Sequence, residues 1–361
     1  MDKINTQIII LSLMSMFRRR FWGFKIPQLQ FKTNGILILT NTSVTASAIF
    51  IPNLADELGA SNVEIGLIGA AYGVAFFISS NFFGRMADIK ERKLIMEAGL
   101  LISAIAFAIQ ALTLIHPLNT VFAVGVMRFL AGFSAGIFPP ALIAYVYEAK
   151  LRLGKFTAWG SLGWAVGSLA AGYIGNYMGI FLLSSMLFLT AFIFSTRLPS
   201  VEGLNLNVPT FPMELIKKNL TIYLAYFLRH VGASAIWVVF PLYLVSLDAN
   251  FFWIGILYAI NNLTQFMVML KIDRFRNFNL ILAGLGFSLV TFTGYIQAVS
   301  FYQIIPFQIT LGFGWSCLYV GSLKFLLERN DEKATVSGLL GSVISLSSVI
   351  GPIFGGFISN F

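Results

Sequence analysis

The strongest constraint on this chain is a series of eleven long apolar segments. Each is near or above the roughly 20 residues with which a tilted helix crosses about 30 Å of hydrocarbon. Runs such as Ile180 to Phe194 lack the alternation of apolar and polar residues that marks the strands of a membrane barrel. The sequence therefore predicts an all-α integral membrane protein with eleven transmembrane helices, at roughly 36–55, 65–83, 94–115, 120–146, 156–177, 180–197, 219–246, 252–270, 279–299, 303–327 and 335–359.

Charge is sparse and lies almost entirely on one side of these segments. Only 11% of the residues are charged, against about a quarter in soluble globular proteins. If the N-terminus is cytoplasmic, 22 of the 24 Lys and Arg residues fall in the N-terminal arm and the cytoplasmic loops. The opposite loops carry acidic residues instead, namely Asp56, Glu57, Glu64 and Asp248. Because positive loops stay on the cytoplasmic side, we expect a multi-pass plasma-membrane protein with a cytoplasmic N-terminus.

The net charge of +9 has two ordinary explanations, nucleic acid or anionic lipid headgroups. Here the charge is spread over short loops rather than gathered in one domain. The sequence therefore predicts the lipid bilayer as a partner and no nucleic acid.

The longest stretch between apolar segments divides the chain. Residues 199–218 contain three prolines and have weak periodicity, so we interpret them as a cytoplasmic linker. The predicted divisions are a cytoplasmic N-terminal arm at 1–34, a six-helix bundle at 35–198 and a five-helix bundle at 219–361. Within the arm, Ile8 to Trp22 could lie on the inner leaflet as an amphipathic helix.

The two halves resemble each other in sequence. Gly132 to Gly136 aligns with Gly312 to Ser316, and Asp88 aligns with Asp273. Each match is weak alone, but together they occur in the same order in both halves. The pattern predicts a duplicated six-helix unit in parallel orientation, an architecture found among transporters.

The stretch from Gly84 to Lys93 resembles a loop signature of the major facilitator superfamily. That signature runs Gly, three residues, Asp, a basic residue, any residue, Gly and two basic residues. Gly84, Asp88, Arg92 and Lys93 fit it, whereas Ile89 and Glu91 depart from it. The stretch around Arg128, Gly132 and Gly136 and the run from Gly351 to Gly356 also resemble the family, so the resemblance covers about 35–361.

This resemblance implies a transporter that binds a small solute at mid-membrane between two rocking bundles. It also implies twelve helices, and we expect the twelfth to be missing here, either by truncation or in a natural short form. The loop signature implies a cytoplasmic gate that ties the halves together in one state, against the simpler interpretation of positive-inside anchoring. The gate candidates are Gly84, Asp88, Arg92, Lys93, Asp273 and Arg274.

Charged and polar residues at mid-membrane depth are the candidate substrate-binding or coupling residues. Arg128 and Arg229 are predicted near the centre of their helices, where a charge is expensive and suggests function. Each could instead be neutralised by helix carbonyls or a polar neighbour, and His230 could be a proton carrier or a packing residue. Uncharged amides at similar depth could line a cavity or bond between helices. These amide candidates are Asn41, Asn261, Asn262, Gln265 and Gln308.

Two further groups are interpreted as packing residues. Small residues in two helices allow close approach of backbones, and these are Gly163, Gly167, Gly351, Pro352, Gly355 and Gly356. Trp237 and Tyr145 are also expected to pack rather than bind.

The sequence predicts a transporter rather than an enzyme. It has no phosphate-binding Gly-rich loop and only two His and one Cys, far apart, so we expect no cofactor and no metal. No Asp or Glu lies at mid-membrane depth, and the two arginines favour an anion or metabolite as the small organic solute. The alternatives are drug efflux by proton antiport and a non-transporting or truncated relative. We expect a monomer, with H⁺ as a partner only if transport is proton-coupled.

Overall fold

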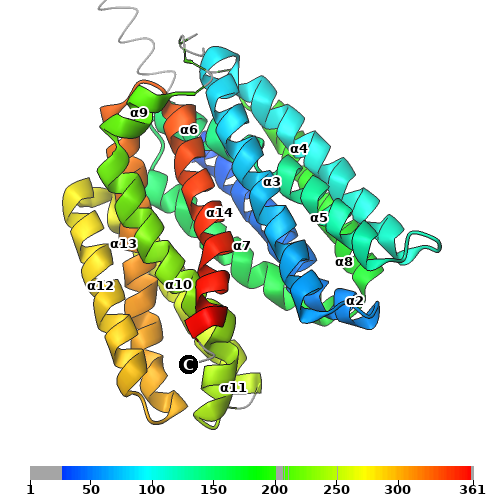
Figure 1. Cartoon of the computed structure of the whole chain (residues 1–361). Coiled ribbons are helices and arrows are strands. Elements are labelled where there is room, and N and C mark those ends of the chain that lie inside the picture. Colours follow the sequence, from blue (N-terminus) through cyan, green and yellow to red (C-terminus); the bar gives the residue numbers. More distant parts are fainter. Residues whose placement is uncertain (1–26, 201–205, 207, 210, 250, 359–361) are drawn as a thin grey trace, which may run out of the picture.

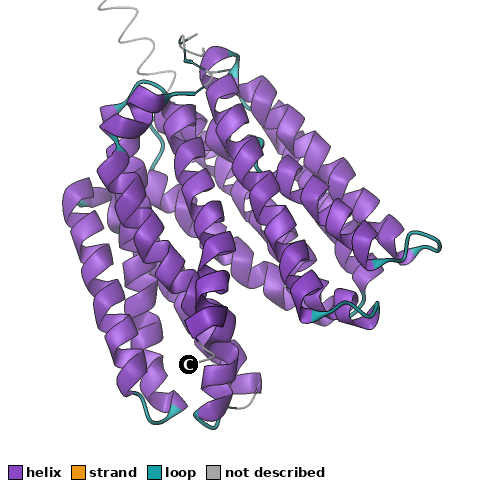
Figure 2. Cartoon of the chain, viewed as in Figure 1, coloured by secondary structure: helices purple, strands orange, loops and turns teal. Residues whose placement is uncertain are grey.

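The computed structural model describes residues 27–200, 206, 208–209, 211–249 and 251–358. This part of the chain is almost entirely helical and contains no strand (Figure 2). The helices are, in order, a first helix at 27–49, α2 (Ile51–Glu57), α3 (Asn62–Ile89), α4 (Arg92–Ile109), α5 (Val121–Ala135), α6 (Phe138–Glu148), α7 (Leu153–Ile174), α8 (Tyr177–Thr196), α9 (Met213–Lys218), α10 (Leu220–Ser246), α11 (Phe251–Met269), α12 (Asn277–Gln297), α13 (Ile304–Arg329) and α14 (Lys333–Ile358).

Several of these helices begin or end at a capping residue. The side chain of Ser61 accepts a hydrogen bond from the Glu64 backbone, and Glu64 bonds back to the Ser61 N–H, which starts α3. Asn176 caps α8 in the same way from its side chain. Gly175, with φ of 65°, ends α7 in the left-handed conformation that glycine adopts without steric cost.

Eight of the described helical segments are long and apolar enough to cross a membrane, by length and composition alone. The predicted segments at 156–177, 219–246 and 252–270 form α7, α10 and α11 but are not among the eight. Eleven crossing helices therefore stays a prediction.

Two boundaries differ from those read from the sequence. Residues 27–34, assigned above to the arm, are helical and continuous with the first segment. The segment at 120–146 is two helices, α5 and α6, because Pro139 and Pro140 at the start of α6 lack the N–H that would continue the backbone ladder. The predicted amphipathic run within the arm lies outside the described residues.

Large apolar side chains cover much of the outer surface. Tyr173 is 94% exposed, Ile296 86% and Phe122 82%. Exposed apolar side chains on this scale mark a surface that contacts lipid or another apolar partner. Together with the apolar helices, they indicate a multi-pass membrane protein.

The two halves, up to α8 and from α10, meet along helix pairs that cross the divide. Helices α3 and α6 pack against α14, and α7 packs against α11. In Figure 1 the halves approach each other at the end where α9 lies and diverge toward the end where α2 lies. We call these the α9 end and the α2 end.

The space around the glycines of α3 shows the same divergence of the two halves. A Cβ at Gly84, near the α9 end, would lie 2.8 Å from the Ala334 carbonyl oxygen, and one at Gly73 would lie 2.7 Å from Val349. A Cβ at Gly66 or Gly69, nearer the α2 end, would meet no atom of the described residues within 4 Å. The halves are therefore in contact at the α9 end and apart at the α2 end.

Within each half, a glycine-bearing helix packs closely on the first long helix of that half. A Cβ at Gly163 of α7 would lie 2.8 Å from the Ile38 carbonyl oxygen, and one at Gly351 of α14 would lie 2.6 Å from that of Val231. Gly167 similarly approaches Thr42. Pro352, Gly355 and Gly356 lie in α14, but their surroundings are outside the described contacts.

We predict that close packing of α12 on α13 depends on Gly284. A Cβ there would lie 2.5 Å from the Leu318 backbone nitrogen, so Gly284→Val forces the helices apart and should lower stability by about 1–3 kcal/mol. Gly286→Val on the same helix is the matched control, because a Cβ there meets nothing within 4 Å. Thermal unfolding in detergent checks this, and equal melting temperatures for the two variants would contradict it.

Candidate functional site

At the α9 end, Asp88 joins the two halves. One carboxylate oxygen accepts from the Ala334 backbone N–H at 3.0 Å, and the other accepts from the Thr335 N–H at 2.6 Å and its hydroxyl at 2.7 Å. These N–H groups belong to the first turn of α14, where the helix dipole favours a negative charge. The Asp88 side chain is fully buried.

Asp88 is held by charged neighbours from its own half. The Arg92 Nη2 atom donates to Asp88 at 2.8 Å, and Arg92 also forms an ion pair with Glu148 at the end of α6. Arg92 is fully buried, so this network replaces the water that its charge would otherwise need. Glu148 is a member of the network that sequence reasoning placed only near a helix end.

Asp273 makes the corresponding contact in the opposite direction. Its carboxylate accepts from the backbone N–H groups of Gly154 at 2.5 Å and Lys155 at 3.3 Å, in the first turn of α7. The Arg152 Nε atom donates to it at 3.3 Å, but the Arg152 side chain is 60% exposed. The two aspartates therefore bind the first turns of α14 and α7 in a reciprocal arrangement.

The other gate candidates have different surroundings. Gly84 lies at the close crossing of α3 and α14. Lys93 contacts its own half, pairing with Glu97 at 3.6 Å and donating to the Thr196 carbonyl at 3.3 Å. Arg274 is exposed and lies over the ring of its neighbour Phe275.

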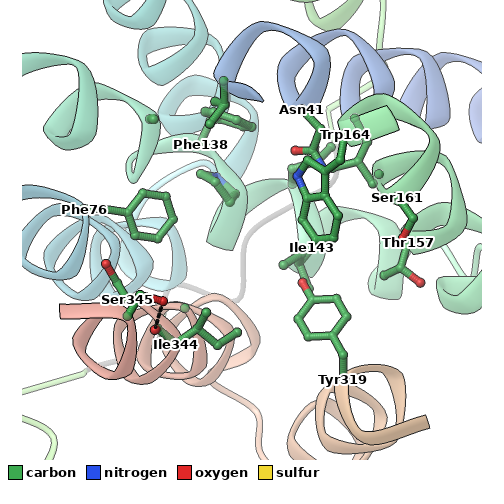
Figure 3. A pocket seen from close by; sticks show the side chains of 18 of the residues that line it. Asn41, Phe76, Phe138, Ile143, Thr157, Ser161, Trp164, Tyr319, Ile344 and Ser345 are labelled. Atoms are coloured by element: carbon green, nitrogen blue, oxygen red, sulfur yellow. Dashed lines mark hydrogen bonds between the residues drawn. The ribbon is translucent and has the colours of Figure 1, made fainter. Parts of the chain in front are cut away.

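A cavity of about 400 Å³, the interbundle cavity, is lined by helices of both halves. Figure 3 shows Phe76, Phe138 and Trp164 on the side of the N-terminal half and Tyr319 and Ile344 opposite them. Asn41, one of the predicted polar residues, lies in its wall. The lining is mostly apolar and aromatic.

A second cavity of about 230 Å³, the C-half cavity, lies within the C-terminal half. It brings together five of the predicted polar residues: Arg229, His230, Asn261, Asn262 and Gln265. Its remaining lining residues are Trp237, Tyr258, Leu311 and Trp315. Trp237 thus packs against Tyr258, as expected of a packing residue, and also lines a polar cavity.

Several nitrogen atoms of the residues that line the C-half cavity lack hydrogen-bond partners among the described residues. The Arg229 Nε atom donates to Ser288 at 3.0 Å, but its buried Nη2 atom has no acceptor. The Trp315 indole nitrogen and His230 Nδ1 are likewise buried and unpartnered. A buried donor without an acceptor costs about 1–3 kcal/mol, so this site is suited to a ligand that supplies acceptors.

The remaining predicted residues are not lining residues of either cavity, although each contacts one: Arg128 lies against Tyr72, and the Gln308 carbonyl accepts from Asn261. Arg128 is buried in the N-terminal half, with its guanidinium 4.4 Å from the centre of the Tyr72 ring. Gln308 is fully buried in α13, and its side-chain amide has no partner among the described residues. Neither residue lines the interbundle or the C-half cavity.

Sequence reasoning missed Trp315, which lines both cavities. Its ring stacks on Tyr319, with centroids 5.8 Å apart, and lies 5.2 Å from the His230 ring. A Trp in an apolar helix gives no signal by itself, but Trp315 lies within the repeat segment that aligned α5 with α13. Within the described part of the chain, no group of three His, Cys, Asp or Glu side chains is placed to hold a metal ion.

Two relatives are similar to the chain in sequence, one named as a transporter and one as a multidrug resistance protein. It is 21% identical over 357 residues to an uncharacterized MFS-type transporter of Methanocaldococcus jannaschii, covering 90% of each chain. It is 28% identical over 239 residues to multidrug resistance protein 2 of Bacillus subtilis, covering 59% of this chain and 58% of that protein.

Solved transporter structures share the fold. The human organic anion transporter MFSD10 superposes with a TM-score of 0.75 at 16% identity, covering 91% of this chain and 92% of that one. A bacterial homologue of the iron transporter ferroportin, in an outward-facing state, superposes with a TM-score of 0.72 at 12% identity, covering 92% of each.

A match to a family model agrees with the sequence pattern, the two helical halves and the superpositions. The Major Facilitator Superfamily model matches residues 34–360, nearly the full length of the chain. The chain is therefore a member of the Major Facilitator Superfamily and a transporter rather than an enzyme.

Proposed function

We propose that this protein moves a small organic anion or metabolite across the plasma membrane by alternating access, with the solute bound between its halves. The observation that carries the proposal is the pairing of a cavity at the divide with Arg229 beside it, a buried cation whose Nη2 atom has no hydrogen-bond acceptor among the described residues. No coupling ion is assigned. The protein acts as a monomer in this proposal, because each chain carries both halves.

The charge distribution supports an orientation for this proposal. The α9 end carries the loops with Lys and Arg, which favours the cytoplasmic side and places the N-terminus there. With Asp88 and Asp273 tying the halves together at that end, the described conformation is closed to the cytoplasm and faces outward. On this account, 35–198 and 219–361 rock about the central cavity and 199–218 links them.

Electrostatics support an anion. Among the described residues that line the two cavities there is no Asp or Glu. A cationic solute would bring a second positive charge close to Arg229 without a counter-charge, which is unfavourable in a site of low dielectric. An anion would neutralise Arg229 and supply the missing acceptors.

Drug efflux is the second candidate function. The mostly apolar interbundle cavity and the similarity to multidrug resistance protein 2 favour it. Proton antiport of a cationic drug requires a group that binds the proton, and His230 is the only titratable side chain other than arginine and tyrosine in the linings described. A cation transported at the same rate by His230→Gln would therefore exclude His230 as that group.

Counterflow in proteoliposomes tests transport itself. Vesicles with purified protein and an internal panel of organic acids should accumulate the matching labelled acid, and Arg229→Ala should lower the initial rate at least tenfold. Arg276→Ala, an exposed residue before α12, is the control and should transport like wild type. If no organic acid, neutral solute or cation moves under any gradient, the transporter proposal fails for this chain.

We predict that Asp88→Asn favours the inward-open state. The substitution removes the charge that binds the first turn of α14, and breaking a buried charge network costs about 3–5 kcal/mol. That range is comparable to the roughly 5.5 kcal/mol that moves a two-state equilibrium from 99:1 to 1:99. Loss of the contact should therefore expose the interbundle cavity to the cytoplasm.

Thiol labelling from each side of the membrane measures this shift. Cys317→Ser removes the only cysteine, and Ile344→Cys places a thiol in the interbundle cavity. Right-side-out vesicles should label well with an impermeant maleimide, and Asp88→Asn should shift labelling toward inside-out vesicles. Asp331→Asn, exposed at the same end, is the matched control. Unchanged sidedness with Asp88→Asn would contradict the gate.

A further inference from the structure

The interbundle and C-half cavities share a thin wall. Trp315 lines both of them. Ser161 of the interbundle cavity donates to the Gln265 side chain of the C-half cavity at 3.3 Å. The hydroxyl of Ser348, also in the interbundle cavity, lies 3.4 Å from His230 Nε2. The two linings are therefore joined by one shared side chain and two side-chain contacts.

The two spaces differ in chemistry. In the interbundle cavity, rings and aliphatic chains such as Phe76, Trp164 and Ile344 form most of the wall (Figure 3). The C-half cavity contains one arginine, one histidine and three amide side chains. An apolar space therefore lies beside a smaller one rich in hydrogen-bond donors. Their volumes, about 400 and 230 Å³, suit the body and the head of a single small molecule, since ligand sites measure about 300–1,000 Å³.

The unpartnered donors identify the kind of head group. Arg229 Nη2 and the Trp315 indole nitrogen carry N–H groups and cannot accept a hydrogen bond. His230 Nδ1 is a donor in one tautomer, and its other nitrogen has Ser348 as a neighbour. A carboxylate or sulfonate offers several acceptor oxygens and the negative charge that would pair with the Arg229 cation. A neutral amide or alcohol offers fewer acceptors and no charge.

We propose that the substrate is an amphipathic organic monoanion. Its acidic group binds Arg229 and the Trp315 N–H in the C-half cavity, while its apolar body occupies the interbundle cavity. Trp315 is the residue between the two subsites, with its nitrogen toward the head and its ring against the body. The proposal rests on the proposed transport function and specifies its substrate class.

This arrangement also couples binding to the movement of the halves. The head is held by residues of α10, α11 and α13, all in the C-terminal half. The body contacts both halves, including Phe76 of α3 and Trp164 of α7. A short anion that fills only the head subsite would bind without contacting the N-terminal half, so it would bind weakly and be transported poorly.

Calorimetric titration of the purified full chain in lipid nanodiscs tests the two subsites. The probes are 4-phenylbutyrate, its neutral analogue 4-phenylbutyramide, the aliphatic acid octanoate and the short acid butyrate. We expect 4-phenylbutyrate and octanoate to bind at least tenfold more tightly than the amide and the short acid. Equal affinities for 4-phenylbutyrate and 4-phenylbutyramide would overturn the proposal, as would no binding of either amphipathic acid at millimolar concentration.

Variants assign each subsite to its residues. Arg229→Gln should weaken 4-phenylbutyrate binding at least tenfold, Arg229→Lys less, and Trp315→Phe several-fold, because phenylalanine keeps the ring but lacks the N–H. Ile344→Trp fills the interbundle cavity, so it should weaken 4-phenylbutyrate and leave butyrate unchanged. Arg276→Gln is the control with an exposed arginine. Melting temperatures near that of wild type show that each variant is folded.

The outcomes separate this proposal from the transport function. If Arg229→Gln and Trp315→Phe bind 4-phenylbutyrate like wild type, the head subsite is wrong even where counterflow of another solute succeeds. If the amphipathic acids bind as expected but no solute crosses the bilayer, the site stands and the transport proposal fails. If Ile344→Trp weakens neither amphipathic acid, the body lies elsewhere and the two-subsite arrangement is overturned.

Discussion

The cost of an unpaired charge away from water shapes both functional parts of this molecule. At the α9 end the cost is met within the protein, because Asp88 is surrounded by Arg92, the Thr335 hydroxyl and two backbone N–H groups. At the C-half cavity the cost is offset only in part, since Arg229 Nε donates to a serine hydroxyl whereas Nη2 has no acceptor among the described residues. The first arrangement holds the halves together, and the second leaves an attraction for an anion.

In the proposed mechanism, these two parts act on the same conformational equilibrium. The aspartates stabilise the conformation in which α3 meets α14 and α7 meets α11 at the α9 end. Gly66 and Gly69 of α3, near the α2 end, have no described neighbour within 4 Å of an added Cβ, which leaves room for the halves to meet there in another conformation. A ligand shifts such an equilibrium only through its different affinity for the two states. In the proposed site, the body of the ligand contacts both halves, and these contacts would give the ligand a different affinity for each conformation.

The sequence was sufficient for the fold because membrane solvation leaves few alternatives. Apolar length predicted the helices, and the spacing of Gly84, Asp88 and Arg92 predicted the family that the whole-family match confirms. The break before α6 at Phe138 was missed, because it depends on a proline pair rather than on hydropathy. The candidate site was only partly predictable. Depth in the membrane selected Arg229, His230 and Gln265, but it also selected Arg128 and Gln308, which are not among the residues that line either cavity. The direction in which a side chain points around its helix decides whether it lines a cavity. A single sequence does not determine that direction for polar residues buried inside a bundle.

The most direct measurement is a structure of the full chain in a lipid nanodisc with 4-(4-bromophenyl)butyrate bound. The bromine marks the body of the ligand, and its carboxylate marks the head. The account predicts the carboxylate within hydrogen-bonding distance of Arg229 and the Trp315 indole nitrogen, with the bromine among Phe76, Trp164 and Ile344. A ligand bound elsewhere, or bound in these cavities with its carboxylate away from Arg229, would contradict the account.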